Sequence, residues 1–227
     1  MLSPEAWPAA SLLYLFGGAM LPKPTFGIER LVRTDHKVAL PCDGGTVVLG
    51  PFERYVAAWT MWQLAATGAV ELTLDPNAKP PPRRSTLPLF LNLLVRRGAG
   101  TVDSAGVLDE QLLDVCPDEP EAVARVIIEW GRRKGVEPKQ LVFLPLEAIV
   151  DLVHRDTCVH LGIEPAAPAR TTIDCAAVRP LRQRFQELRA DWELFSATDP
   201  DVAAALLDGC GSGVGYLRPV PTANIHL

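Results

Sequence analysis

Three apolar stretches with helical spacing each end at a glycine, and a short apolar stretch follows each of them. They span residues 52–67, 87–97 and 120–134 and end at Gly68, Gly98 and Gly135. Glycine commonly ends helices, because it adopts the left-handed backbone conformation without steric cost. After Gly68, residues 70–74 alternate as a half-buried strand does. The sequence therefore predicts a repeated helix-then-hairpin unit, which is the local form of winged-helix domains.

Further helices and one more hairpin are expected elsewhere. Turn residues at 43–45 lie between two runs of strand-forming residues and predict a hairpin over 37–49. The remaining helices are expected over residues 3–17, 146–160, 180–195 and 199–209, with a flexible turn at the glycine-rich run 209–215. The predicted fold class is mainly α with short β-hairpins, arranged as helix–hairpin, winged-helix-like units in a helical globular domain.

Two divisions of the chain into domains fit this pattern. The first is a helix–hairpin domain over residues 1–163, with a C-terminal helical extension over 164–227 packed on it. The second is one single domain over residues 1–216. A linker that contains proline and threonine, at 165–172, marks the boundary in the first division.

Composition and charge restrict the class of protein. Hydrophobic residues make up 48% of the chain and charged residues 22%, which excludes disorder for the bulk of it. The net charge of −5 argues against a nucleic-acid partner, because proteins that bind nucleic acids carry excess lysine and arginine. Residues 6–22 are uncharged but too short for a membrane span. We expect a buried first helix there, or alternatively a segment lying in a membrane interface.

The five cysteines indicate a reducing compartment. Their number is odd, and no two of them have the C-x-x-C spacing. They are Cys42, Cys116, Cys158, Cys175 and Cys210. We therefore expect reduced, scattered thiols in a cytoplasmic protein rather than a disulfide framework.

The densest cluster of metal-ligating or nucleophilic side chains is His154, Cys158 and His160. His154 and Cys158 are four residues apart and share one helical face. A zinc site needs about four ligands, and the fourth would come from afar, from Cys175 or Asp174. A nucleophilic cysteine needs a base that a third group orients. The preferred interpretation is an ordinary helix edge, so we predict no catalytic residue, no metal and no cofactor. A small enzyme or metal protein that uses this region is the last alternative.

One predicted helix carries an apolar seam at spacings of four, three, four and three residues. The seam consists of Leu181, Phe185, Leu188, Trp192 and Phe195. Such a seam fits a partner helix. The partner belongs either to the same chain or to another protein, which includes a second copy of this one.

Three stretches of the chain resemble one known family. They are residues 54–70, 106–112 and 126–143. Over roughly residues 52–145 they are similar to the Golgi phosphoprotein family, whose members bind phosphatidylinositol-4-phosphate. Where that family has its headgroup arginines, this chain has Ala57, Ala124 and Val126, and Arg54 and Arg125 lie nearby. The resemblance implies the fold more directly than the ligand.

The resulting expectation is a non-enzymatic peripheral adaptor that touches an anionic lipid headgroup or membrane surface. Its binding residues would be Arg54, Arg83, Arg84 and Arg125, two of which follow the proline run 80–82. The alternative is a winged-helix-like protein-interaction module that uses the 181–195 seam. The expected location is cytoplasmic, with peripheral membrane association.

Overall fold

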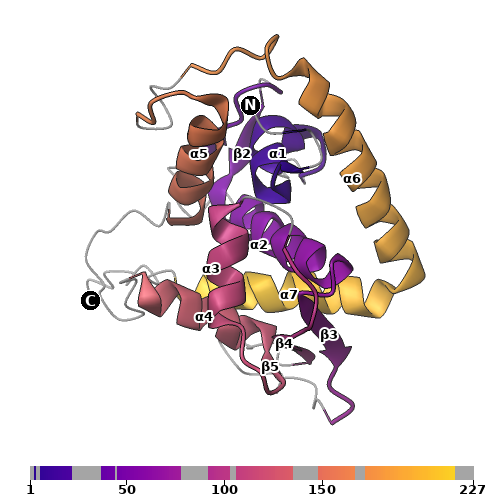
Figure 1. The fold of residues 1–227 in the computed structure, drawn as a ribbon. Coiled ribbons are helices and arrows are strands. Elements are labelled where there is room, and N and C mark those ends of the chain that lie inside the picture. Colours follow the sequence, from indigo (N-terminus) through magenta and orange to yellow (C-terminus); the bar gives the residue numbers. More distant parts are fainter. Residues whose placement is uncertain are drawn as a thin grey trace, which may run out of the picture.

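A computed structural model describes residues 3, 6–21, 37–43, 45–77, 92–102, 106–134, 148–166 and 172–217. These residues form a mainly helical fold with short antiparallel strands, which confirms the predicted mainly α class with short β-hairpins (Figure 1). The helices are α1 (Ala9–Phe16), the 3-10 turn η2 (Gly17–Ala19), α2 (Leu49–Ala66), α3 (Val107–Val115), α4 (Val123–Arg133), α5 (Ala148–Leu161), α6 (Arg179–Thr198) and α7 (Pro200–Leu217). The strands are β1 (Lys37–Ala39), β2 (Thr46–Val48), β3 (Val70–Leu74), β4 (Leu93–Arg97) and β5 (Glu121–Ala122).

Helix α2 lies at the centre of the fold, as its apolar sequence predicts. It packs against α1, α3 and α7, and Phe52, Trp59 and Leu64 are among its buried side chains. Just after the helix, Gly68 has a φ of +71°, in the left-handed region that glycine adopts without strain. Gly68 therefore ends the helix and turns the chain back into β3, as predicted.

Strands β3, β4 and β5 form one antiparallel sheet in that order. The prediction of a helix over 87–97 is wrong for residues 93–97, which form β4, and residues 87–91 lie outside the described part. Leu93 and Val95 are buried, whereas Leu94 between them is half-buried, so burial follows the two-residue period of a strand. Leucine and arginine favour a helix by intrinsic propensity, but pairing with β3 and β5 overrides it here.

Two glycines let the end of β4 approach the turn at Gly68. The Gly98 N–H donates to the Ala69 carbonyl, and the Gly100 N–H donates to the Gly68 carbonyl, each at 2.8 Å. A Cβ atom on Gly98 or Gly100 would overlap the backbone of residues 67–69. Both positions therefore need glycine for close approach.

The threefold helix–glycine–strand pattern is thus found once among the described residues, at Gly68. Gly98 follows a strand instead of ending a helix, and Val102, in the apolar stretch that comes after Gly98, has no regular structure. Gly135 lies outside the described residues. A glycine flanked by apolar residues marks a sharp turn or a close contact, and the sequence alone does not distinguish the two.

The predicted first hairpin is confirmed by β1 and β2, which pair with Lys37 opposite Val48. The expectation for the cysteines is wrong for one pair, because Cys42 and Cys175 form a disulfide. They are 133 residues apart in the sequence, so their spacing could not reveal that the fold joins them. The other three, Cys116, Cys158 and Cys210, are free thiols, as expected, and they are buried.

Helices α6 and α7 enclose the core from two sides. Figure 1 shows α6 running past α1 and α7 crossing beneath α2. Helix α7 continues to Leu217, so the prediction of a turn at 209–215 is wrong. The reason is packing: α7 lies against α2 and α4, and a Cβ on Gly209 would lie 3.4 Å from Val123 of α4. Small residues permit this close contact between helices, which outweighs their poor helix propensity.

Candidate functional site

Arg54 lies in the second turn of α2, near the start of the helix. Its guanidinium Nη2 is 2.7 Å from Oδ1 of Asp208 in α7, and its side chain is 37% exposed. The aliphatic part of Arg54 lies over Gly211, where a Cβ would be 3.0 Å from the Arg54 Cδ. Gly211 thus leaves room for the arginine to lie along α7.

Arg125 lies in the first turn of α4 and is 60% exposed. Its Nη1 is 3.5 Å from Oε1 of Glu121, and the same oxygen accepts a hydrogen bond from the Ala122 N–H at 3.0 Å. The N-cap residue of α4 is Ala122, and its side chain forms no capping hydrogen bond. A helix N-terminus attracts negative charge, and at α4 the Glu121 carboxylate supplies it.

Both arginines belong to elements that meet one short stretch of α7. Arg54 contacts Asp208 and Gly211, and Gly209 between them faces Val123, two residues before Arg125. The two arginines nevertheless have different partners, and Arg125, two residues after the Val123 that faces α7, projects from another side of α4. We call Arg54, Arg125 and their partners Asp208 and Glu121 the arginine surface. The acidic partners of both arginines are exposed by about two fifths, and ion pairs at such exposure contribute at most about 1 kcal/mol. An incoming anion therefore competes with weak pairs.

The other two predicted arginines lie outside the described residues. Arg83 and Arg84 belong to the connection between β3 and β4, which starts beyond Asn77 and ends before Asn92. Strand β4 pairs with β5, and α4 follows β5 directly. The start of β4 therefore lies beside the strand that leads into the first turn of α4.

His154, expected at an ordinary helix edge, is part of a buried hydrogen-bonded network. Its Nε2 is 2.9 Å from the Ala166 carbonyl oxygen, which can only accept, so Nε2 carries the proton. Its Nδ1 then accepts from the Tyr14 hydroxyl at 3.0 Å. The Cys158 Sγ lies 3.8 Å from Nε2, and burial raises the pKa of the Cys158 thiol. A protonated, fully buried thiol is a poor nucleophile.

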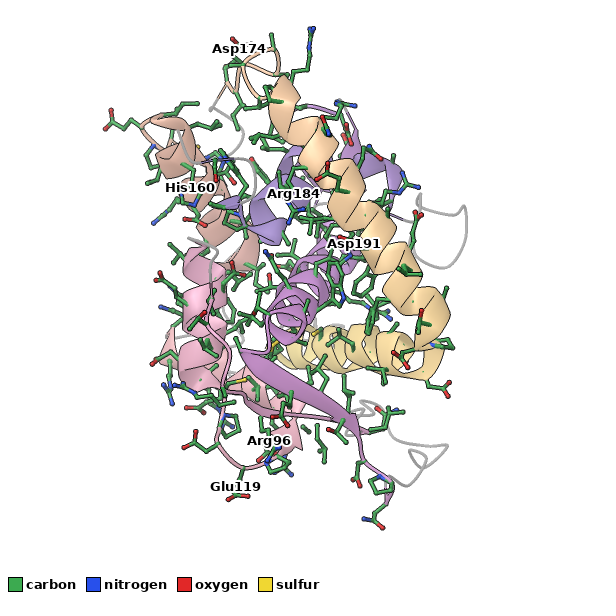
Figure 2. All side chains as sticks on the ribbon, turned by 45° about the vertical axis from the view of Figure 1, so that its right-hand side comes forward. Arg96, Glu119, His160, Asp174, Arg184 and Asp191 are labelled. Carbon is green, nitrogen blue, oxygen red and sulfur yellow. A yellow bond between two sulfur atoms is a disulfide. The ribbon has the colours of Figure 1, made fainter. Side chains whose placement is uncertain are left out.

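Asp156 and His160 link α5 to the start of α3. Asp156 Oδ2 accepts from the Val107 N–H at 3.2 Å, and Oδ1 lies 3.4 Å from His160 Nε2. Burial raises the pKa of Asp156, and the neighbouring His160 opposes that shift. The Trp7 ring meets the His160 ring edge-on. Figure 2 shows His160 on α5, well away from Arg96 on the sheet. Asp156 thus caps α3 from another helix.

Sequence reasoning found His154, Cys158 and His160 but missed Tyr14 and Asp156. The one local signal was the four-residue spacing of Asp156 and His160. Nowhere in the described ranges do three His, Cys, Asp or Glu side chains gather closely enough to hold a metal ion.

The predicted seam on α6 is occupied within the chain. Leu181, Phe185, Leu188 and Trp192 are buried, and Phe195 is partly buried. The Phe185 ring stacks on Trp59 at 6.0 Å between centroids, and the Trp192 ring meets Trp62 edge-on at 5.5 Å. Of the two partners considered for the seam, the structure provides the one in the same chain.

A shallow pocket lies between α3 and α4, with a volume of about 360 Å³. Its lining residues are Glu110, Gln111, Asp114, Val115, Trp130, Arg133 and Lys134. Arg133 Nη1 is 3.3 Å from Asp114 Oδ2, and the Trp130 indole donates to Gln111 Oε1. The pocket combines both signs of charge, so it favours neither anions nor cations.

Comparisons with protein-family models, with curated proteins and with solved structures find no match for this chain. Among the residues that the structure describes, no helix combines the length and apolar character that crossing a bilayer requires.

Proposed function

We propose that the protein is a non-enzymatic peripheral adaptor that binds an anionic lipid headgroup at the arginine surface. The observation that carries the proposal is the position of Arg125. It lies in the first turn of a helix whose N-cap side chain forms no capping hydrogen bond, and the partly exposed Glu121 carboxylate balances the positive helix end.

A phosphate group suits this position better than a carboxylate does. It offers more acceptor oxygens and a larger negative charge, and the fork of N–H donors on an arginine matches its geometry. Backbone amides at a helix N-terminus also bind phosphate. Arg54 adds a second guanidinium, which pairs with Asp208 of α7. The sequence between β3 and β4 also contains Arg83 and Arg84. Each basic residue near an anionic membrane contributes about 1 kcal/mol to the free energy of binding.

The other hypotheses find less support. The His154 and Cys158 side chains are buried and hydrogen-bonded, which favours a structural role over a catalytic one. The 181–195 seam is covered by α1 and α2, which leaves little of it for a protein partner. The resemblance of residues 52–145 to a phosphoinositide-binding family bears on the fold more directly than on the ligand, because Ala57, Ala124 and Val126 stand where that family has its headgroup arginines.

Vesicle flotation tests the proposal. Phosphatidylcholine vesicles with and without phosphatidylinositol-4-phosphate are mixed with the protein and floated. We expect recovery only with the anionic lipid, and about fivefold weaker binding for Arg125→Ala or Arg54→Ala. Arg189→Ala is the matched control, because Arg189 also forms a surface ion pair, with Glu193 of α6. Equal recovery with both kinds of vesicle contradicts the proposal.

A second variant tests the position of the headgroup. Glu121→Gln removes the carboxylate charge from the start of α4 and leaves an amide of the same shape. We expect it to bind the anionic vesicles more tightly than the unmodified protein, with neutral vesicles unaffected. If Glu121→Gln leaves anionic binding unchanged while Arg125→Ala weakens it, the headgroup binds elsewhere along Arg125 and the helix N-terminus plays no part.

A further inference from the structure

The disulfide joins two segments that are distant in the sequence. Cys42 lies in the turn after β1, and Cys175 lies in the turn before α6, with their Cα atoms 5.4 Å apart. This separation is in the range that a disulfide requires. The bond therefore fastens the β1–β2 hairpin to the start of α6.

Non-covalent contacts hold the same two segments together. Arg182 of α6 is 3.3 Å from both the Asp43 carboxylate and the Cys42 carbonyl oxygen. Asp43 also accepts a hydrogen bond from the Gly18 N–H at 3.1 Å, and the Arg182 guanidinium lies 5.1 Å from the Phe16 ring centroid. These contacts do not depend on the sulfur–sulfur bond. With the bond open, they keep the two thiols close, which favours its re-formation.

Solvent access separates this pair from the other cysteines. Cys175 is exposed and Cys42 is half-buried, whereas Cys116, Cys158 and Cys210 are buried. Burial raises the pKa of Cys116 to about 11 and that of Cys210 to about 12. Because the thiolate is the reactive form, the three buried thiols are slow in exchange reactions. An exposed disulfide, in contrast, is open to attack by an external thiolate.

We propose that Cys42 and Cys175 form a reversible thiol–disulfide exchange site for low-molecular-weight thiols of the glutathione class. In the reducing direction, a glutathione thiolate attacks the exposed Cys175 sulfur, the sulfur–sulfur bond breaks and the Cys42 thiolate leaves and takes up a proton. A second glutathione thiolate then releases Cys175 as a thiol. The products are two protein thiols and one oxidised glutathione, so the two electrons come from the two glutathione molecules.

The expected consequence is a local change in mobility. In the disulfide form the β1–β2 hairpin is fastened to α6. In the dithiol form only the contacts of Asp43 and Arg182 hold it, and both side chains of that ion pair remain reachable by water. The hairpin and residues 172–181 then open more often, while α2 and α4 are unaffected. This inference is independent of the lipid-binding proposal.

Redox titration of the full-length protein tests the inference. The protein is equilibrated with different ratios of reduced to oxidised glutathione, alkylated under native conditions and digested, and each cysteine is scored by mass spectrometry. We expect Cys42 and Cys175 to change together and reversibly, with the other three alkylated only after denaturation. The inference is overturned if the pair stays unlinked at every ratio, if it resists reduction until the protein unfolds, or if a buried cysteine exchanges first.

A variant separates the role of the non-covalent contacts from that of the bond. Asp43→Asn weakens the ion pair with Arg182, and we expect the equilibrium constant for disulfide formation to fall about fivefold. Asp191→Asn is the matched control, since Asp191 is exposed on α6 (Figure 2). Hydrogen exchange of the two redox forms gives a second measurement, with faster exchange at residues 37–48 and 172–181 in the dithiol form. Identical exchange in both forms excludes a change in mobility and overturns the proposed consequence.

Discussion

Tyr14 shows how one polar side chain fixes another inside the core. Its hydroxyl donates to His154, and that histidine bonds to the Ala166 carbonyl on its other side. The network joins α1 to α5 and to the segment after α5. Sequence patterns identified His154 through its spacing from Cys158, but Tyr14 is 140 residues away and belongs to an apolar run. A contact between such distant residues is determined by helix packing, which no local spacing encodes.

Replacing Tyr14 by phenylalanine tests the strength of this network. We expect Tyr14→Phe to lower the free energy of unfolding by about 1–2 kcal/mol at neutral pH, because the buried hydrogen bond between the Tyr14 hydroxyl and His154 Nδ1 is lost. Urea denaturation measures the change. Tyr55→Phe is the matched control, since Tyr55 is partly buried and its hydroxyl has no hydrogen bond among the described residues.

The same variant has a pH signature. Burial raises the pKa of Tyr14 above its usual value of 10, with smaller contributions from Cys158 and Asp151. Above pH 10 the unfolded chain therefore loses the tyrosine proton while the folded chain keeps it, so the folded state becomes less stable as pH rises. The Tyr14→Phe variant has no hydroxyl to titrate at this position, so it does not show this loss of stability. The stability gap between the two proteins should narrow above pH 10, and a gap that widens there would contradict the assignment.

At the scale of elements, the sequence predicted structure correctly where a local pattern, rather than tertiary contacts, decides the conformation. Helix α2 and the β1–β2 hairpin were predicted, because a long apolar helix and turn residues between two short apolar runs are strong local signals. Strand β4 was mistaken for a helix, since its partner strands decide its conformation. The glycine-rich end of α7 was mistaken for a turn, since contact with α2 and α4 supports the helix there. Both errors arise from tertiary contacts that override propensity.

Glycine-to-alanine substitutions distinguish the two reasons why a position needs glycine, which are close backbone approach and a left-handed backbone. We expect Gly98→Ala and Gly100→Ala to lower the free energy of unfolding most, by about 3 kcal/mol or more, because the added Cβ overlaps the backbone near Gly68. Gly162→Ala should cost about 1–2 kcal/mol, since its φ is +69° but the space around it is open. Thermal and urea unfolding measure these changes in the free energy of unfolding.

Gly45→Ala is the control for that series. Gly45 has no atom within 4 Å of an added Cβ and no left-handed backbone, so the substitution should be neutral or slightly stabilising. If Gly98→Ala were as mild as Gly45→Ala, the close approach of β4 to the turn at Gly68 would be wrong.

At the scale of the whole molecule, the aromatic residues of α2 and α6 join the two segments into which the sequence divides. Trp59 and Trp62 of α2 meet Phe185 and Trp192 of α6, and α7 packs on α2 and α4. Residues from both sides of position 163 belong to one hydrophobic cluster. Such a shared core unfolds as one unit, because opening either segment exposes the same apolar surface.

We therefore expect one cooperative unfolding transition, with the same midpoint by far-ultraviolet circular dichroism and by tryptophan fluorescence. Trp192→Ala should lower the free energy of unfolding by about 3–5 kcal/mol and keep a single transition. Leu194→Ala on the same helix is the matched control, because Leu194 is 67% exposed and its loss should change stability by less than about 0.5 kcal/mol.

A shortened chain separates the two predicted domain divisions. Residues 1–163 alone lack α6 and α7, so the faces of α1 and α2 that Phe185 and Trp192 cover would meet water. At about 25 cal/mol per Å² of apolar surface, losing several aromatic contacts removes an amount of free energy comparable to the total stability of a domain. We expect the fragment to show no cooperative transition in urea. A sharp transition in the fragment, or two separate transitions in the full chain, would instead establish residues 1–163 as a domain that folds on its own.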